Sequence, residues 1–214
     1  MYLIVFGAPG VGKGTQAKFI STKFNIAHLS TGEMLREAVK NETDLGKRAG
    51  ELIAQGKLVA DQIMLELIAD RISRPDCEDG FILDGFPRTI VQAEGLENLM
   101  QDMNLPALTC IDIVVPTDAI ITRLVNRRLC ASCGTDYNLV TNPPAENMIC
   151  NVCGGHVIQR EDDNEETISN RMNIYQQQTA PLRQFYKNKG KYHKIDGSRS
   201  ITEVQSEIFK IIKV

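Results

Sequence analysis

Short apolar segments alternate along the chain with longer segments in which apolar residues recur at helical spacing. The apolar segments predict β-strands over residues 2–6, 81–84, 108–115 and 191–196. The strand over 108–115 is almost continuously apolar, as expected where helices cover both faces of a parallel sheet. This alternation predicts an α/β protein with a doubly wound parallel sheet, which binds ligands at the carboxyl ends of its strands.

Helices are predicted between and after these strands. Their segments are 14–24, 32–40, 45–55, one containing Ile63, Met64, Leu67, Ile68 and Ile72, one that begins after Thr89, and 201–213. Thr89-Ile90-Val91-Gln92 has the spacing of a capping box, in which the two polar side chains satisfy free N–H groups at a helix start. In the last helix, the side expected to be buried contains Ile201, Val204, Ile208, Ile211 and Ile212.

Two stretches interrupt the alternation. Residues 30–59 contain helical patterns without a core strand, and residues 126–163 contain four cysteines, Pro143-Pro144 and few helix formers. We interpret both as insertions at the ligand-binding edge of one core. That core is formed by residues 1–29, 60–125 and 164–214.

Composition and charge narrow the class of protein. The 214 residues suffice for one full hydrophobic core with insertions. No apolar run approaches the roughly 20 residues of a membrane span, and the N-terminus lacks the pattern of an export signal, so we expect a cytoplasmic protein. A net charge of −3 gives no general attraction to nucleic acid, so neither nucleic acid nor a membrane is an expected partner.

The segment between the first strand and the first helix has the composition of a phosphate-binding loop. Gly7 to Lys13 follows the spacing G-x-x-x-x-G-K, although position 14 is glycine and the hydroxyl comes one residue later, at Thr15. Glycines let backbone N–H groups approach phosphate oxygens, while the helix N-terminus and the lysine add positive charge. A plain strand-to-helix turn is the alternative, and the lysine with four glycines argues against it.

The cysteines form two close pairs. Cys130-x-x-Cys133 and Cys150-x-x-Cys153 have 16 residues between them, within the range of a four-thiolate zinc site. Redox pairs and inert cysteines are the alternatives. Cys110 lies in an apolar run and is expected in the core, whereas Cys77 is expected in a loop without a role.

Arginines fall where the ligand edge of the sheet is expected. They are Arg36, Arg88, Arg123, Arg127, Arg160 and Arg171. A guanidinium binds phosphate oxygens through two parallel hydrogen bonds, although a single arginine is more often a solvated surface residue. Of these arginines, Arg88 is the one most expected to bind phosphate, because Gly85-Phe86-Pro87 constrain the loop that carries it.

Asp84 ends an apolar strand beside the predicted phosphate loop, where P-loop enzymes keep a carboxylate for Mg²⁺; an ordinary strand-end aspartate is the alternative. His28, His156 and His193 lie near no nucleophile in the sequence. A nucleoside monophosphate acceptor needs no general base, because its phosphate is largely dianionic near pH 7. What such a reaction needs is dense, fixed positive charge with little water.

These residues resemble one family closely, the adenylate kinases of the long, zinc-lid bacterial type. The matching motifs cover the whole chain in the family's order: Gly7 to Thr15, Ser30-Thr31-Gly32-Glu33-Met34-Leu35-Arg36, Asp84-Gly85-Phe86-Pro87-Arg88-Thr89, Asn126-Arg127-Arg128, both cysteine pairs, Arg160-Glu161-Asp162-Asp163 and Thr179-Ala180-Pro181-Leu182. The resemblance implies a monomeric enzyme that converts MgATP and AMP reversibly to MgADP and ADP, with a structural Zn²⁺.

The resemblance also implies roles for particular residues. ATP would be bound by Gly10, Val11, Gly12, Lys13, Gly14, Thr15, Arg127, Asp136, Tyr137 and, through its backbone, Arg199. AMP would be bound by Thr31, Arg36, Lys57, Leu58, Val59, Gly85, Phe86, Pro87, Arg88, Gln92, Arg160 and Arg171, with Gln92 reading the adenine. Catalysis would depend on Lys13, Asp84, Arg88, Arg123, Arg160 and Arg171. Zinc would be held by Cys130, Cys133, Cys150 and Cys153.

Two residues depart from the family pattern. Glu33 replaces the more usual aspartate, and Asp136 stands where threonine is commoner, which leaves the ATP contact before Tyr137 in question. A kinase of the same architecture with another base preference, such as a GTP donor or a UMP or CMP acceptor, is the nearest alternative. A zinc-ribbon nucleic-acid module is disfavoured, because residues 130–158 contain no lysine or arginine and one aromatic residue. A regulatory GTPase is also disfavoured, because the Asn-Lys-x-Asp motif that reads guanine is absent from the sequence.

Overall fold

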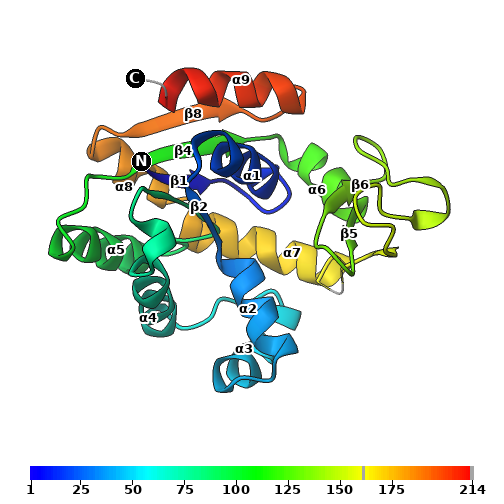
Figure 1. The fold of residues 1–214 in the computed structure, drawn as a ribbon, viewed down its shortest axis with the longest axis horizontal. Coiled ribbons are helices and arrows are strands. Elements are labelled where there is room, and N and C mark those ends of the chain that lie inside the picture. Colours follow the sequence, from blue (N-terminus) through cyan, green and yellow to red (C-terminus); the bar gives the residue numbers. More distant parts are fainter. Residues whose placement is uncertain (161, 213–214) are drawn as a thin grey trace.

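A five-stranded parallel sheet forms the centre of the protein in the computed structural model, which describes residues 1–160 and 162–212 (Figure 1). The strand order is β2-β3-β1-β4-β8. The strands are β1 (Tyr2–Phe6), β2 (Ala27–Ser30), β3 (Phe81–Asp84), β4 (Thr109–Val114) and β8 (Tyr192–Asp196). Glu161 of the acidic motif and Lys213 of the last predicted helix lie outside the described residues.

The four strands predicted from apolar runs are confirmed, but β2 was missed. Its sequence contains one buried apolar residue, Leu29, with His28 and Ser30 on either side. β2 is an edge strand paired only with β3 among the described residues, so it needs little apolar surface. By contrast, residues 3–6 of β1 are at most 3% exposed, which fits a sheet covered on both faces.

Helices pack around this sheet (Figure 1). They are α1 (Lys13–Phe24), α4 (Asp61–Ile72), α5 (Ile90–Asp102), α6 (Thr117–Val125), α7 (Glu165–Ile174), α8 (Leu182–Asn188) and α9 (Ile201–Ile212), with a short 3₁₀ helix η1 (Pro75–Cys77) and a π-helical turn η3 (Tyr175–Thr179). Among the described residues, none of the helices has the length and apolar character needed to cross a membrane.

Details of burial correct two expectations. Ile201 begins α9 and is 40% exposed, so it does not belong to the buried side of that helix, whereas Val204, Ile208 and Ile212 do. Cys77 lies in η1 and is buried, so it is not a loop residue, and its Sγ lies 3.1 Å from Arg71 Nη1. Cys110 is fully buried in the core, as predicted.

The first interrupting stretch forms two helices, α2 (Thr31–Lys40) and α3 (Asp44–Ala54), which pack against each other and extend beyond the end of β2 (Figure 1). Ser30 and Thr43 cap their N-termini by accepting bonds from Glu33 N and Gly46 N. Both helices therefore begin close to where the sequence predicts. The assignment of residues 30–59 as a separate unit stays a prediction.

The second stretch folds as a small antiparallel sheet of order β6-β5-β7, which the sequence did not indicate. Its strands are β5 (Arg127–Cys130), β6 (Asp136–Asn138) and β7 (Val157–Ile158), with a 3₁₀ turn η2 (Glu146–Met148) between them. It has its own cluster of buried residues, separate from the main core: Cys130, Tyr137, Cys150 and Val157. So small a cluster provides little hydrophobic stabilisation. The small sheet therefore needs other stabilising interactions, and its cysteines are the candidates to provide them.

Candidate active site

The loop after β1 presents backbone N–H groups at the carboxyl end of the sheet. α1 begins at Lys13, and its N-cap residue Gly12 adopts φ +98° and provides no capping side chain, so the first-turn N–H groups face outward for an anion. Gly10 adopts φ +80°, and a Cβ there would lie 2.7 Å from Leu124 Cγ. Glycine is therefore required by both conformation and space, and the predicted phosphate-binding loop has the geometry for its role.

Lys13 lies over this loop. Its Nζ donates to the carbonyl oxygens of Gly7 at 3.0 Å and Ala8 at 2.8 Å. The pKa of Lys13 is lowered from 10.5 to about 8, mainly by burial; the positive charges of Arg88 and Arg171 act in the same direction, and the attraction of Asp84 opposes them. The ammonium thus sits in an excess of positive charge that a phosphate would relieve.

Asp84 ends β3 beside the loop, as predicted. Burial raises the pKa of its carboxyl group, but the neighbouring His28 imidazole, Lys13 and Arg88 hold that pKa below its usual value. His28 Nε2 lies 3.5 Å from Asp84 Oδ2. A Cβ on Gly14 would lie 3.3 Å from the same oxygen, so a larger residue in place of Gly14 would crowd the carboxylate. Sequence reasoning assigned no role to His28, because Asp84, its neighbour in space, is more than fifty residues away along the chain.

Arg88 is held in place by the loop that follows β3. Its Nε donates to Gly85 O at 2.7 Å, and the Thr31 hydroxyl donates to the same carbonyl at 3.0 Å. The Thr179 hydroxyl donates to Arg88 O at 2.8 Å. Burial lowers the pKa of Arg88, while Asp84 and Asp162 oppose the shift. The prediction that this loop fixes Arg88 is therefore confirmed by its contacts.

Three further arginines meet two adjacent aspartates. Arg160 makes a two-pronged bond to Asp162, at 2.9 and 2.7 Å, and Arg171 Nη1 lies 3.1 Å from the same carboxylate. Arg127 Nε donates to Asp163 Oδ2 at 2.6 Å. Although burial opposes it, these arginines hold the pKa of Asp162 well below its usual value. The acidic pair supplies counter-charge to the guanidinium groups, a role that sequence reasoning did not assign.

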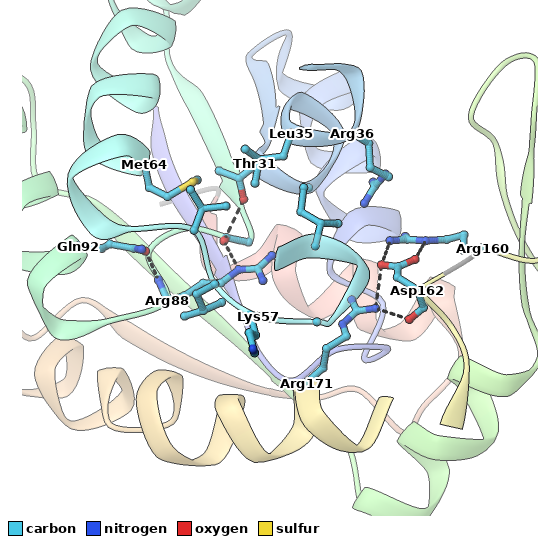
Figure 2. Close-up of a pocket in the computed structure, with 16 residues that line it drawn as sticks. Thr31, Leu35, Arg36, Lys57, Met64, Arg88, Gln92, Arg160, Asp162 and Arg171 are labelled. Carbon is cyan, nitrogen blue, oxygen red and sulfur yellow. Dashed lines mark hydrogen bonds and ion pairs between the residues drawn. The ribbon is translucent and has the colours of Figure 1, made fainter. Parts of the chain in front are cut away.

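A pocket between α2, α4 and the loop after β3 has two chemically different ends (Figure 2). Figure 2 shows Gln92 and Met64 together at one end, and Leu35, Ile53 and Val59 add further apolar side chains to the lining. The other end contains the guanidinium groups of Arg36, Arg160 and Arg171, and Arg88 lies between the two ends. Of the predicted AMP-binding residues, Phe86 and Pro87 line an adjacent pocket, and the others line this one directly.

A larger cleft lies on the other side of the arginines. Its walls include Gly10 to Thr15, Asp84, Arg123, Arg127, Asp136, Tyr137 and Arg199. Arg123 donates to Gly197 O at 2.9 Å and lies 3.4 Å from Val11 O, so it joins the phosphate loop to the loop after β8. Arg36, Arg88, Arg160 and Arg171 line both the cleft and the smaller pocket.

The two departures from the family pattern lie on either side of one lysine. Lys18 of α1 reaches Asp136 at 3.2 Å and Glu33 at 3.7 Å. It therefore links β6 of the small sheet to the start of α2. Tyr137, next to Asp136, is 4% exposed, and its hydroxyl lies 3.2 Å from Cys150 Sγ.

The four paired cysteines converge at one point. Their Sγ atoms all lie within 4.8 Å of one another, with Cys130 and Cys153 at 3.5 Å and Cys133 and Cys150 at 3.6 Å. A tetrahedron of thiolates about 2.3 Å from a zinc ion has edges of about 3.8 Å. The donor set and its spacing thus fit a four-coordinate metal. The cysteines are all free, as such a site requires.

The two pockets and the guanidinium groups between them define the class of protein: a P-loop kinase, in which the phosphates of a donor meet those of an acceptor. The sequence model of the adenylate kinase family matches residues 5–191. An adenylate kinase of Caldicellulosiruptor saccharolyticus is 47% identical over 214 residues, which cover 100% of both chains. One of Archaeoglobus fulgidus is 46% identical over 213 residues, covering 100% of this chain and 98% of the relative. One of Staphylococcus epidermidis is 47% identical over 212 residues, covering 99% of each.

The chain therefore belongs to the adenylate kinase family, whose members are phosphotransferases that use ATP with Mg²⁺. The family resemblance inferred from the sequence motifs is confirmed. So is the doubly wound α/β fold.

Proposed function

We propose that this protein catalyses the reversible transfer of a phosphoryl group from MgATP to AMP, giving MgADP and ADP. The observation that carries the proposal is the sharing of Arg36, Arg88, Arg160 and Arg171 by two pockets. A phosphate entering from either side meets the same guanidinium groups, so donor and acceptor phosphates are brought together where their repulsion is offset. We therefore propose that the reaction takes place at the junction of the two pockets.

The larger cleft is the proposed ATP site. The N–H groups of Gly10 to Thr15 would hold its phosphates, with Lys13 following the charge onto the transferred group and Arg123 and Arg127 beside it. Asp136, Tyr137 and the backbone of Arg199 would border the base and sugar. Asp84 has the position and charge to hold Mg²⁺, which would neutralise charge on the transferring phosphates.

The smaller pocket is the proposed AMP site. Its apolar end accommodates a purine, with the Gln92 amide to recognise the base and the Val59 backbone beside it. Thr31, Lys57, Leu58 and Gly85 to Arg88 would complete the contacts, and the guanidinium groups would bind the phosphate. Because that phosphate is largely dianionic near pH 7, we assign no residue as general base.

The remaining proposals concern assembly. Residues 30–59 and 126–163 would close over the substrates as two mobile units, which would exclude the water that could otherwise accept the phosphoryl group. Zinc would fill the cysteine site as a structural ion, since four thiolates leave no coordination position for water. We also propose a monomeric, cytoplasmic enzyme.

A coupled assay for ADP production from ATP, with each nucleoside monophosphate supplied in turn, tests the function. We expect AMP to be the preferred acceptor and ATP the preferred donor. Preference for UMP or CMP, or for GTP as donor, would contradict the proposal while leaving the class of enzyme intact.

A further inference from the structure

The amide of Gln92 is bonded on both sides by groups of the protein itself. Its Oε1 accepts from Arg88 N at 2.7 Å, a bond that Figure 2 shows, and its Nε2 donates to Asp61 Oδ1 at 2.8 Å. The same Asp61 oxygen accepts from the Thr89 hydroxyl at 3.0 Å. Asp61 is the first residue of α4 and Thr89 is the N-cap of α5, so these bonds also tie the starts of the two helices together.

The chemistry of the two partners dictates which way the amide faces. A carboxylate accepts hydrogen bonds, so it must meet the NH₂ group, and a backbone N–H donates, so it must meet the oxygen. Turning the Gln92 amide over would place oxygen against carboxylate and NH₂ against N–H. The Thr89 hydroxyl is oriented as well, because it accepts from Gln92 N at 3.1 Å and so directs its proton toward Asp61.

The Gln92 amide keeps one N–H and one oxygen lone pair for hydrogen bonds to a ligand, and the bonds to the protein fix which side of the amide carries each of them. Gln92 is 2% exposed and lines the smaller pocket, whereas Asp61 is not among the described residues that line it. The 6-amino group of adenine donates to such an oxygen and the ring nitrogen beside it accepts from such an N–H, a two-bond match of glutamine and adenine. A 6-oxopurine presents an acceptor in place of the amino donor and is mismatched.

We propose that Asp61 is a specificity-determining residue: by fixing the orientation of the Gln92 amide, it selects a 6-aminopurine over a 6-oxopurine at the acceptor site. The inference rests on the proposed function, in which Gln92 faces the acceptor base. Asp61 acts through Gln92 and is therefore a positioning residue. Its effect is on recognition of the base and not on the phosphoryl group, which the arginines bind.

The test compares AMP with IMP, which differ at the 6-position. Dissociation constants from calorimetry and kcat/KM from the coupled assay are measured for the parent, Asp61→Ala, Asp61→Asn and Asp61→Glu. Asp61→Ala should lower the AMP-to-IMP selectivity about tenfold, the size expected for losing a hydrogen bond to a charged group, with kcat at saturating AMP within about threefold of the parent. Asp61→Asn should keep selectivity within about threefold, because its amide oxygen can accept the same two bonds.

Asp44 provides the matched control, since it is also the first residue of a helix and is exposed. Asp44→Ala should leave selectivity unchanged, which separates loss of a helix-end charge from loss of orientation. If Asp61→Ala does not fold, Asp61→Glu decides, because it keeps the charge but displaces the oxygens and should give intermediate selectivity. An unchanged AMP-to-IMP selectivity in Asp61→Ala, or in Asp61→Glu where Asp61→Ala does not fold, would overturn the inference alone. A parent chain that binds no AMP would overturn the proposed function and the inference with it.

Discussion

Replacing Lys13 by methionine should make the empty protein more stable while removing most of its activity. Burial is the main reason that the pKa of Lys13 is lowered from 10.5 to about 8, and the charges of Arg88 and Arg171 add to it. At about 1.4 kcal/mol per pH unit, the charged form at pH 7 costs the folded protein about 3 kcal/mol. Losing the two hydrogen bonds that Lys13 Nζ donates to carbonyl oxygens would lower the stability of the variant by about 1 kcal/mol for each bond.

The difference between these terms is a net stabilisation of about 1 kcal/mol at pH 7, or a rise in Tm of about 2–4 °C for a chain of this size. The effect has a defined pH dependence. Between pH 8 and 10.5 the unfolded parent binds a proton at this residue that the folded parent does not, so the stability of the parent rises with pH in that window. The advantage of Lys13→Met should therefore shrink as the pH rises from 8 toward 10.5.

Thermal melts of both proteins without nucleotide, over pH 7 to 10, measure the stability, and the coupled assay measures kcat. Losing one preorganised contact to the transition state should lower kcat by about 10² to 10³. Lys13→Arg is the control, because its charge persists above pH 8 and its stability should not rise in the same window. A Lys13→Met variant less stable than the parent at every pH, or with activity within threefold of it, would refute the reasoning.

Three other changes test separate parts of the site. Arg88→Ala should lower kcat about 10²-fold, since it removes a fixed charge at the junction of the pockets; an effect on KM for ATP alone would contradict its placement. Gln92→Ala should raise KM for AMP about tenfold and leave KM for ATP unchanged. The reverse pattern would mean that the assignments of the two pockets are reversed. Cys150→Ser should weaken zinc binding, measured by metal analysis, and lower Tm by about 5 °C or more, with appreciable activity remaining below the melting transition. Zinc-free protein of unchanged stability would rule out a structural role.

The parts of this protein that the sequence could predict are those carried by short segments. The phosphate-binding loop, the capping residue Thr89 and the strand before Asp84 are each visible within a few neighbouring residues, because glycine conformation, capping and burial are local properties. The paired cysteines were likewise readable from spacing, and their convergence is confirmed. The choice of zinc stays a prediction.

What could not be predicted depends on contacts between distant segments. The bond of Asp61 to Gln92 spans 31 residues and that of Arg127 to Asp163 spans 36. No periodicity encodes such pairs in one sequence. β2 was not predicted for a different reason: an edge strand that contains His28 and Ser30 lacks the apolar run that identified the other strands. The small antiparallel sheet has strands of two to four residues, too short for an alternating pattern to register.

Arg127, Arg160 and Arg171, which we propose bind nucleotide phosphates, are paired in this structure with the carboxylates of Asp162 and Asp163. On the proposed function, nucleotide binding would therefore replace these carboxylates with phosphates as the partners of the guanidinium groups. Part of the attraction between guanidinium and phosphate is used to release the carboxylates, which moderates affinity. Asp162 and Asp163 would pair with the arginines again as the product leaves, and this pairing would favour product release. A reversible kinase benefits from such an exchange in both directions, because neither pair of nucleotides can become trapped by the charge that the reaction needs.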